Sequence, residues 1–306
     1  MIVCKCKACG GEMSIDGAGG LKCEYCGNKA HLSDKELEGY KVYRTQMLNF
    51  IRAAHDNEKT TDYVDALWNY AEHTSFKTSD GTNIDISYLY NVTEGPATMY
   101  MCRSSVLYHF PLTQKVAASH MLNGINSIEY PAADIKGLDR CFPQLIGNYT
   151  LSDGSTLIAF KRDENVFPLA IFGALNPKHV AWIISRMENI CCTLEYSELV
   201  HGGFSVESIF INPKTHEAVL YGGWWNYSKK NPISPALNND LADLRKVATR
   251  ILGIYKSDSP KALIKFLEDK PAKDAFADFE TWDKVIKDGF GGRSFTKMDI
   301  DTSLNF

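Results

Sequence analysis

Four cysteines near the N-terminus constrain the fold of this chain more than any other feature. They form two pairs, Cys6 with Cys9 and Cys23 with Cys26, in a C-x2-C…C-x2-C pattern. A glycine follows each pair and lets the backbone amides turn toward the sulfur atoms. Four thiolates at this spacing suit a tetrahedral structural Zn²⁺ site, which leaves no open coordination position for chemistry. We therefore expect these four residues to bind Zn²⁺.

This cysteine pattern resembles that of a zinc ribbon and covers residues 1–32. Cys4 and His31 lie beside it as spare candidates. Cys4 in place of Cys6 would give a longer C-x4-C pair, and His31 follows a complete ligand set. About thirty residues bury too little apolar surface to fold alone, so the metal should supply much of the folding free energy.

The composition of the 306 residues is that of a soluble globular protein, with 44% hydrophobic and 23% charged residues. At roughly 150 residues per domain, this length suggests about two domains. A net charge of -4 gives no pull toward nucleic acid or anionic membrane. The sequence has no run of about 18 apolar residues and no signal-peptide core, so we expect a cytoplasmic protein without membrane association.

Residues 33–74 predict a helical connector. Ser33 and Glu36 form a plausible capping box at its start. Apolar residues then recur at helical spacing, with polar residues between them. We expect this connector to dock on the domain that follows.

The hydrophobic period changes after the connector. Stretches rich in β-branched and aromatic residues predict strands at 83–92, 97–104 and 105–111, a helix at 112–131 and a hairpin at 147–162 that turns at Asp153-Gly154. The most apolar helix of the chain follows at 176–200. Two short strands (208–212 and 218–221), a polar loop and three helices (240–253, 259–269 and 275–289) complete the chain.

This order resembles the protein kinase-like fold, an α+β fold in which a small sheet-based lobe precedes a mainly helical lobe. The resemblance places the small lobe at 75–173 and the large lobe at 174–306. In kinases a H-R-D-x-x-x-x-N loop follows the buried helix, and its Asp and Asn serve phosphoryl transfer and magnesium binding.

The stretch HGGFSVES stands where that loop belongs, but its chemical groups differ. His201 supplies the histidine, whereas Gly203 replaces the Asp and Ser208 replaces the Asn. The magnesium-binding D-F-G falls on Tyr221 to Gly223, which puts a phenol in place of a carboxylate.

The small lobe shows the same losses. The turn NVTEGPAT has one glycine, Gly95, before a proline that has no amide hydrogen. His109 occupies the position of the phosphate-contacting lysine, and the helix KVAASHMLNGINS has no acidic residue. Asp240 resembles the aspartate that ties a large-lobe helix to the His-x-x backbone, although a helix N-cap explains it equally well.

The resemblance therefore implies a pseudokinase, a non-catalytic scaffold or regulator that binds a protein partner and not a nucleotide. The sequence GGWWNY suggests Trp224, Trp225 and Tyr227 as partner-binding residues. The alternative is that one tryptophan packs into the cleft that the nucleotide would fill.

Two other functions stay open. One is an atypical nucleotide-dependent phosphotransferase that uses relocated catalytic groups. The other is a zinc-ribbon regulator of nucleic acid, which would need a basic face. Residues 1–30 contain four lysines and three acidic residues, a poor phosphate-binding footprint.

Overall fold

The computed structural model describes residues 13–15, 20–23, 26–31, 68, 71–131, 137–230, 240–294 and 298. The chain divides into two compact units. The first comprises Met1–Tyr70 with Asp299–Phe306, and the second comprises Ala71–Met298. The second unit contains every position of the kinase-like motifs.

The first unit contains a three-stranded antiparallel sheet in the order β1-β2-β3. Its strands are Met13–Ile15 (β1), Gly20–Cys23 (β2) and Lys29–His31 (β3). The predicted connector at 33–74 falls almost wholly outside the described residues. At its end Trp68 is helical, but 72–74 already belong to a strand of the second unit.

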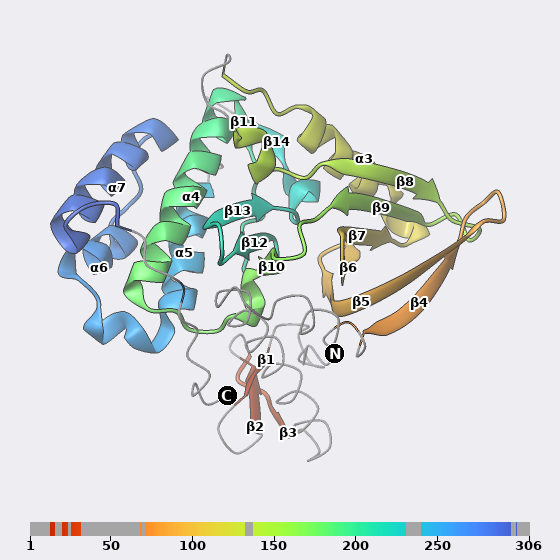
Figure 1. Ribbon diagram of the computed structural model, residues 1–306, viewed down its shortest axis with the longest axis horizontal. Coiled ribbons are helices and arrows are strands. Elements are labelled where there is room, and N and C mark those ends of the chain that lie inside the picture. Colours follow the sequence, from red (N-terminus) through yellow and green to blue (C-terminus); the bar gives the residue numbers. More distant parts are fainter. Residues whose placement is uncertain are drawn as a thin grey trace. The chain divides into compact units, whose positions relative to one another are not determined.

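The second unit begins with a six-stranded antiparallel sheet in the order β4-β5-β6-β7-β9-β8 (Figure 1). Its strands span Glu72–Lys77 (β4), Asn83–Glu94 (β5), Ala97–Cys102 (β6), Ser105–Phe110 (β7), Leu145–Thr150 (β8) and Thr156–Lys161 (β9). A bridge between Thr78 and Leu151 joins the ends of the two edge strands, so the sheet curls. The predicted strands and hairpin are confirmed, whereas β4 was not predicted.

Side chains alternate between the two faces of this sheet. One face packs a core that includes Leu107 and Leu157. The short 3-10 turn η1 (Leu112–Gln114) and helix α3 (Lys115–Asn126) follow β7, and α3 packs beside β7 and β9. The predicted helix at 112–131 is therefore confirmed in its central part.

Helix α4 (Pro177–Tyr196) is the central helix of the remaining part. Its predicted apolar face is entirely buried and consists of Val180, Ile183, Ile184, Met187, Ile190, Cys191 and Leu194. Asn176 caps the helix by accepting the amides of Lys178 and His179. Helices α5 (Asp240–Leu252) and α7 (Ala275–Phe290) pack against α4, and α6 (Lys261–Glu268) packs against both α5 and α7 (Figure 1).

Short elements lie between the sheet and the helices. Strands β10 (Phe167–Pro168), β12 (Ile209–Asn212) and β13 (Glu217–Leu220) form one small sheet, and β11 (Leu199–Val200) pairs with β14 (Ser228–Lys229). Single 3-10 turns occur at Leu138–Cys141 (η2), Leu169–Ile171 (η3), Trp224–Asn226 (η4) and Gly253–Asp258 (η6). These pairings bring the loops 201–208 and 221–227 side by side.

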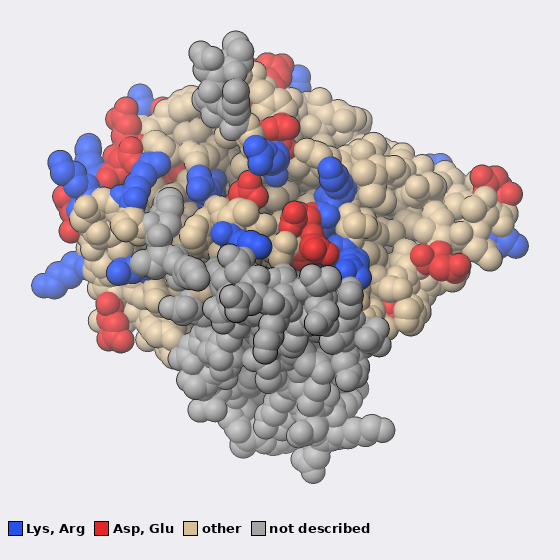
Figure 2. Space-filling model, viewed as in Figure 1, with Lys and Arg blue, Asp and Glu red and all other residues tan. Residues whose placement is uncertain are grey.

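Charged side chains are unevenly spread over the second unit. In Figure 2 both signs lie interspersed over the helical part, whereas the region over β8 and β9 is mostly without charge. Among the residues described, no helix has the length and apolar character needed to cross a membrane.

Candidate functional site

Asp240 ties helix α5 to the loop that begins at His201. Its two carboxylate oxygens each accept one backbone amide at 2.7 Å, from His201 and from Gly202. This is the contact that the kinase-like interpretation predicts for Asp240. Burial raises the pKa of its carboxyl to about 6, and the two amides oppose this rise.

The His201 side chain is fully buried and uses both ring nitrogens inside the chain. Nε2 lies 2.9 Å from the carbonyl oxygen of Gly222, and Nδ1 accepts the amide of Gly203. Burial lowers the pKa of this imidazole to about 3. The ring is therefore neutral and holds the two loops together. Neither nitrogen is available for proton transfer, because each already takes part in a hydrogen bond.

Gly203 and Gly223 lie in close backbone contact where these loops meet. A Cβ built on Gly203 would lie 2.9 Å from the backbone of Gly223, and a Cβ on Gly223 would lie 2.5 Å from the carbonyl oxygen of Gly203. Gly223 also has a φ of 80°, which side chains rarely adopt. The backbones of these two residues thus leave no room for a side chain at either position.

Tyr221 was predicted to stand at the position of the magnesium-binding aspartate, and its side chain makes contacts within the second unit. Its hydroxyl donates to the carbonyl oxygen of Lys161 at 2.6 Å, at the end of β9, and its ring lies against Phe210. The residue that faces the sheet is Gly222, one position later. A Cβ on Gly222 would lie 2.5 Å from a carboxylate oxygen of Glu94 and 2.9 Å from the hydroxyl of Tyr108. No sequence pattern indicated Glu94 at this position.

Ser208 closes a small turn instead of binding a ligand. Its hydroxyl accepts the amide of Ser205, and the hydroxyl of Ser205 accepts the amide of Ser208. The Ser205 hydroxyl also donates to Glu94 at 3.1 Å. Ser208, predicted to stand where kinases have the Asn, thus closes a turn whose Ser205 contacts the β5–β6 turn.

His109 was predicted to stand at the position of the phosphate-contacting lysine, and its side chain also makes contacts within the second unit. His109 lies on the sheet face away from the loops, against the ring of Phe76 and 3.1 Å from the hydroxyl of Ser155. Because side chains alternate along β7, the loops are faced by Tyr108 and Phe110. Burial raises the pKa of the Tyr108 phenol well above its usual value, so this position carries no charge.

The three aromatic residues proposed for partner binding make contacts inside their own unit. Trp224 is fully buried, and its indole nitrogen donates to Leu220. Trp225 packs edge-on against Tyr108 and Phe110, with ring centroids 5.9 and 6.0 Å apart, respectively. A Cβ on Gly95 would lie 2.9 Å from its indole nitrogen, so Trp225 lies under the β5–β6 turn.

Tyr227 packs on helix α3. Its ring lies 4.3 Å from that of His120, and a Cβ on Gly124 would lie 2.7 Å from the Tyr227 ring. His120 Nδ1 also lies 2.9 Å from the carbonyl oxygen of Trp225. Segment 224–227 is therefore fastened to α3 as well as to β7.

Half of the predicted zinc site lies among the described residues. Cys23 ends β2 and is buried, whereas Cys26 lies exposed in the turn that leads to β3. The amide of Gly27, whose φ is 70°, donates to the Cys23 carbonyl oxygen at 2.9 Å. This tight turn fits one half of a Cys4 zinc site.

Cys6 and Cys9 lie outside the described residues, as does Cys4, and the side chain of His31 is not described. Within the described parts no group of three or more His, Cys, Asp or Glu side chains could hold a metal ion. The Zn²⁺ site therefore stays a prediction.

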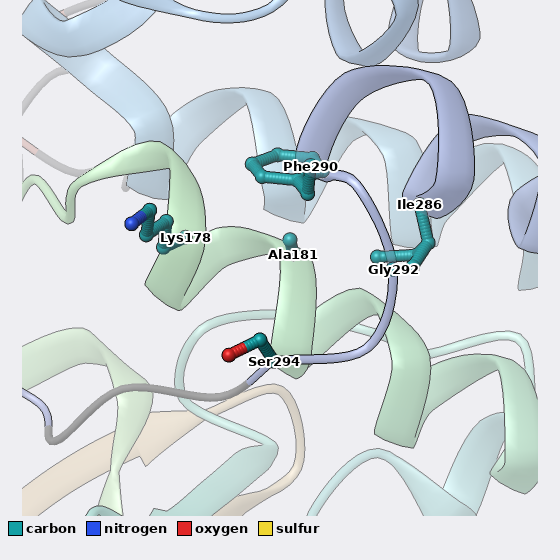
Figure 3. A pocket seen from close by; sticks show the side chains of 6 residues that line it. All are labelled: Lys178, Ala181, Ile286, Phe290, Gly292 and Ser294. Atoms are coloured by element: carbon teal, nitrogen blue, oxygen red, sulfur yellow. The ribbon is translucent and has the colours of Figure 1, made fainter.

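A separate pocket lies between the start of α4 and the end of α7 (Figure 3). Six residues line it: Lys178, Ala181, Ile286, Phe290, Gly292 and Ser294. It has one cation and one hydroxyl but neither a carboxylate nor an imidazole. This lining contains no acid–base pair for catalysis.

Comparison with known proteins gives similarity in fold only. No protein family matches the sequence, and no curated protein matches it. Among solved structures, vaccinia related kinase 3 is 13% identical, with a TM-score of 0.48 over 74% of this chain and 96% of that chain. WbdD is 8% identical, with a TM-score of 0.46, and the match covers 70% of this chain and 49% of that chain. The kinase-like motif positions therefore stay predictions.

Proposed function

We propose that residues 71–298 form a protein kinase-like domain without phosphoryl-transfer activity, and that the chain acts as a zinc-ribbon pseudokinase that binds other proteins. The observation that carries this proposal is the close approach of Gly203 and Gly223. Phosphoryl transfer depends on a positioned base, metal-binding carboxylates and cations around the phosphates. Under this proposal Gly203 stands at the position of the base and Tyr221 or Gly222 at that of the metal-binding aspartate, and none of these residues has a carboxylate.

The β5–β6 turn supports the same proposal. In a kinase the corresponding loop covers the phosphates with its backbone amides. Here Trp225 lies under Gly95, and Glu94 places a negative carboxylate beside Gly222. A carboxylate repels phosphate, and an indole takes up the space that a nucleotide would need.

Nucleotide binding is the direct test. The zinc-loaded chain is heated with ATP or GTP, with and without Mg²⁺, and its melting temperature is recorded. A ligand at 100 times its dissociation constant would stabilise the folded state by about 2.7 kcal/mol, a shift of roughly 5–10 °C for a domain of this size. We expect no shift, and a clear Mg²⁺-dependent shift would contradict the proposal.

Glu94 favours a second candidate function, an atypical phosphotransferase. Its carboxylate lies next to Gly222, where the metal-binding aspartate of a kinase would begin, and carboxylate oxygen is a preferred Mg²⁺ ligand. If this candidate is right, Mg²⁺ with ATP raises the melting temperature and Glu94→Gln abolishes that shift. The matched variant Glu72→Gln, on the edge strand β4, should keep it.

We also propose that Cys6, Cys9, Cys23 and Cys26 bind one structural Zn²⁺. The tight turn from Cys23 to Gly27 supports this assignment. Metal analysis should find one Zn²⁺ per chain, and Cys9→Ser should release it. Cys4→Ser is the matched control and should retain the metal. Loss of Zn²⁺ from Cys4→Ser but not from Cys6→Ser would reassign the first pair.

A further inference from the structure

The pocket between the start of α4 and the end of α7 is a cavity that the proposed function does not use (Figure 3). Its volume is about 190 Å³. A Cβ built on Gly292, one of its lining residues, would meet no atom within 4 Å. For comparison, an apolar cavity of about 150 Å³ takes up benzene. The pocket therefore has room for one aromatic ring with a short side chain.

One part of the lining is apolar. Ala181 of α4 and Ile286 of α7 are each 3% exposed and form its inner wall. Phe290, in the last turn of α7, adds an aromatic ring. Transfer of an apolar group from water onto such a wall is favourable, and an aromatic ring packs well against another ring. This part of the pocket suits the ring of a ligand.

The other part of the lining carries two polar side chains, Lys178 and Ser294, and both residues are exposed. In Figure 3 the Lys178 nitrogen and the Ser294 oxygen lie on the side of the pocket away from Ile286. Within the described residues, the Lys178 ammonium has no salt-bridge partner and the Ser294 hydroxyl has no hydrogen-bond partner. An ammonium attracts an anion, and both groups can donate hydrogen bonds to it. This end of the pocket suits a negatively charged group.

The charge at the pocket fits a ligand with one negative charge. Arg293, between two lining residues, already pairs with Asp283 and lies over the ring of Phe279. Among the described residues at the pocket, Lys178 is thus the cation that has no partner. A carboxylate carries one charge, whereas a phosphate monoester carries about −1.5 to −2 at pH 7. One ammonium therefore matches a carboxylate better than a phosphate.

We propose that this pocket binds a small aromatic monocarboxylate. The ring of the ligand packs against Ala181, Ile286 and Phe290, and its carboxylate lies at the exposed end, where it accepts hydrogen bonds from Lys178 and Ser294. The lining has no acid–base pair, so the ligand is bound and not transformed. This inference goes beyond the proposed function, because the pocket shares no residue with the motif loops.

The test uses phenylacetate as the probe and the full zinc-loaded chain. Binding is measured by ligand-observed NMR as the probe is titrated. We expect saturation with a Kd on the order of 1–10 mM, because a ligand with so few atoms gains little free energy in total. Phenylacetamide has nearly the same shape but no charge, and it should bind at least about 5-fold more weakly.

Two variants locate the probe on the protein. Lys178→Glu reverses the charge at an exposed position and should weaken binding of phenylacetate by at least about 10-fold. Ala181→Leu adds three carbon atoms to the inner wall, fills the cavity and should abolish binding. Lys115→Glu, at an exposed residue on α3, makes the same change in net charge and should leave the Kd unchanged. If Ala181→Leu does not fold, the two exposed lysine variants still decide the result.

Three outcomes would overturn the proposal. The first is no saturable binding of phenylacetate at about ten times the expected Kd. The second is equal affinity for phenylacetate and phenylacetamide, since Lys178 would then make no contribution. The third is an affinity that Lys178→Glu leaves unchanged or that Lys115→Glu lowers equally, which would place the probe elsewhere. None of these outcomes bears on nucleotide binding.

Discussion

The motif loops and the helical core of the second unit use acidic side chains in opposite ways. In the loops, glycines and not acidic side chains occupy positions 203, 222 and 223, where the two segments meet. In the helical core Asp240, Glu188 and Asp278 are all buried. Asp240 holds the His201 loop, and Asp278 accepts Arg245 at 2.8 Å. In the helical core Asp240 and Asp278 thus fasten elements together, whereas the meeting point of the two loops consists of glycine backbone.

The largest effect is expected from adding a side chain where Gly203 and Gly223 approach each other. Gly223→Ala should lower the free energy of unfolding by about 4 kcal/mol, because a methyl group meets the Gly203 carbonyl in a left-handed backbone conformation. Urea unfolding measures this loss. Gly81→Ala is the control, since Gly81 also has a positive φ but open space around it, and should cost about 1 kcal/mol. Equal losses would mean that the close approach contributes nothing.

The second prediction concerns the carboxylate that remains. Asp240→Asn should cost about 3 kcal/mol, because an amide nitrogen replaces one of the two oxygens that accept backbone amides and leaves a buried amide unpaired. Asp243→Asn on the same helix removes only an exposed ion pair with Lys246 and should cost under about 0.5 kcal/mol. Similar losses for the two variants would mean that the hydrogen bonds from the His201 and Gly202 amides to Asp240 contribute little to stability.

The third prediction concerns Glu188, a buried carboxyl of the helical core. Glu188 is fully buried beside Asp278, and burial followed by the Asp278 charge raises the pKa of its carboxyl to about 9. A raised pKa gives stability below about pH 4.5 that is lost as the pH rises through 9. At pH 7 the carboxyl must take up a proton on folding, which costs about 3 kcal/mol.

Glu188→Gln should therefore stabilise the protein at pH 7 by about 2–3 kcal/mol and flatten its stability between pH 5 and pH 9. Denaturant unfolding at pH 5, 7 and 9 measures both effects. The exposed Glu280→Gln on α7 is the control and should change the stability by less than about 0.5 kcal/mol. An unchanged pH dependence in Glu188→Gln would show that this carboxyl ionises normally in the folded protein.

The sequence was sufficient to predict the elements with a clear hydrophobic period. The strands β5, β6 and β7 and the buried face of α4 follow directly from that period, and the Asp240 contact was expected only from the resemblance to the kinase-like fold, with a helix N-cap as the alternative. Strand β4 was missed because EHTSFK is short and partly charged, and it lies next to a stretch with helical spacing. A short edge strand of this kind has little pattern to detect.

The site itself was less predictable, because its motifs are degenerate. Without an anchoring lysine or aspartate, an alignment can slip by one residue, and one residue reverses the face of a strand. Such a slip exchanges His109 for Tyr108, and Tyr221 for Gly222, at the motif positions. The contacts of Glu94 and Trp225 join segments more than one hundred residues apart, so no local pattern could indicate them.

The last prediction concerns His201, which contacts Asp240 of helix α5 and Gly222 of the second loop. Burial lowers the pKa of His201 to about 3, whereas in the unfolded chain it titrates near 6.5. The unfolded state therefore binds more protons between these values, and this group makes stability fall as the pH drops below 6.5. At pH 5 the loss should be about 2 kcal/mol relative to pH 7.

Glu188 and Asp240 contribute slopes of the opposite sign in this range, so the wild-type curve alone does not isolate His201. The informative quantity is the cost of His201→Gln at each pH. This cost should shrink by about 2 kcal/mol between pH 7 and pH 5. Glutamine does not titrate, so the variant lacks the loss of stability that His201 causes at low pH. The exposed His73→Gln on β4 should show no such change. A cost of His201→Gln that is the same at both pH values would mean that the folded protein accepts the proton, and that His201 is available for proton transfer.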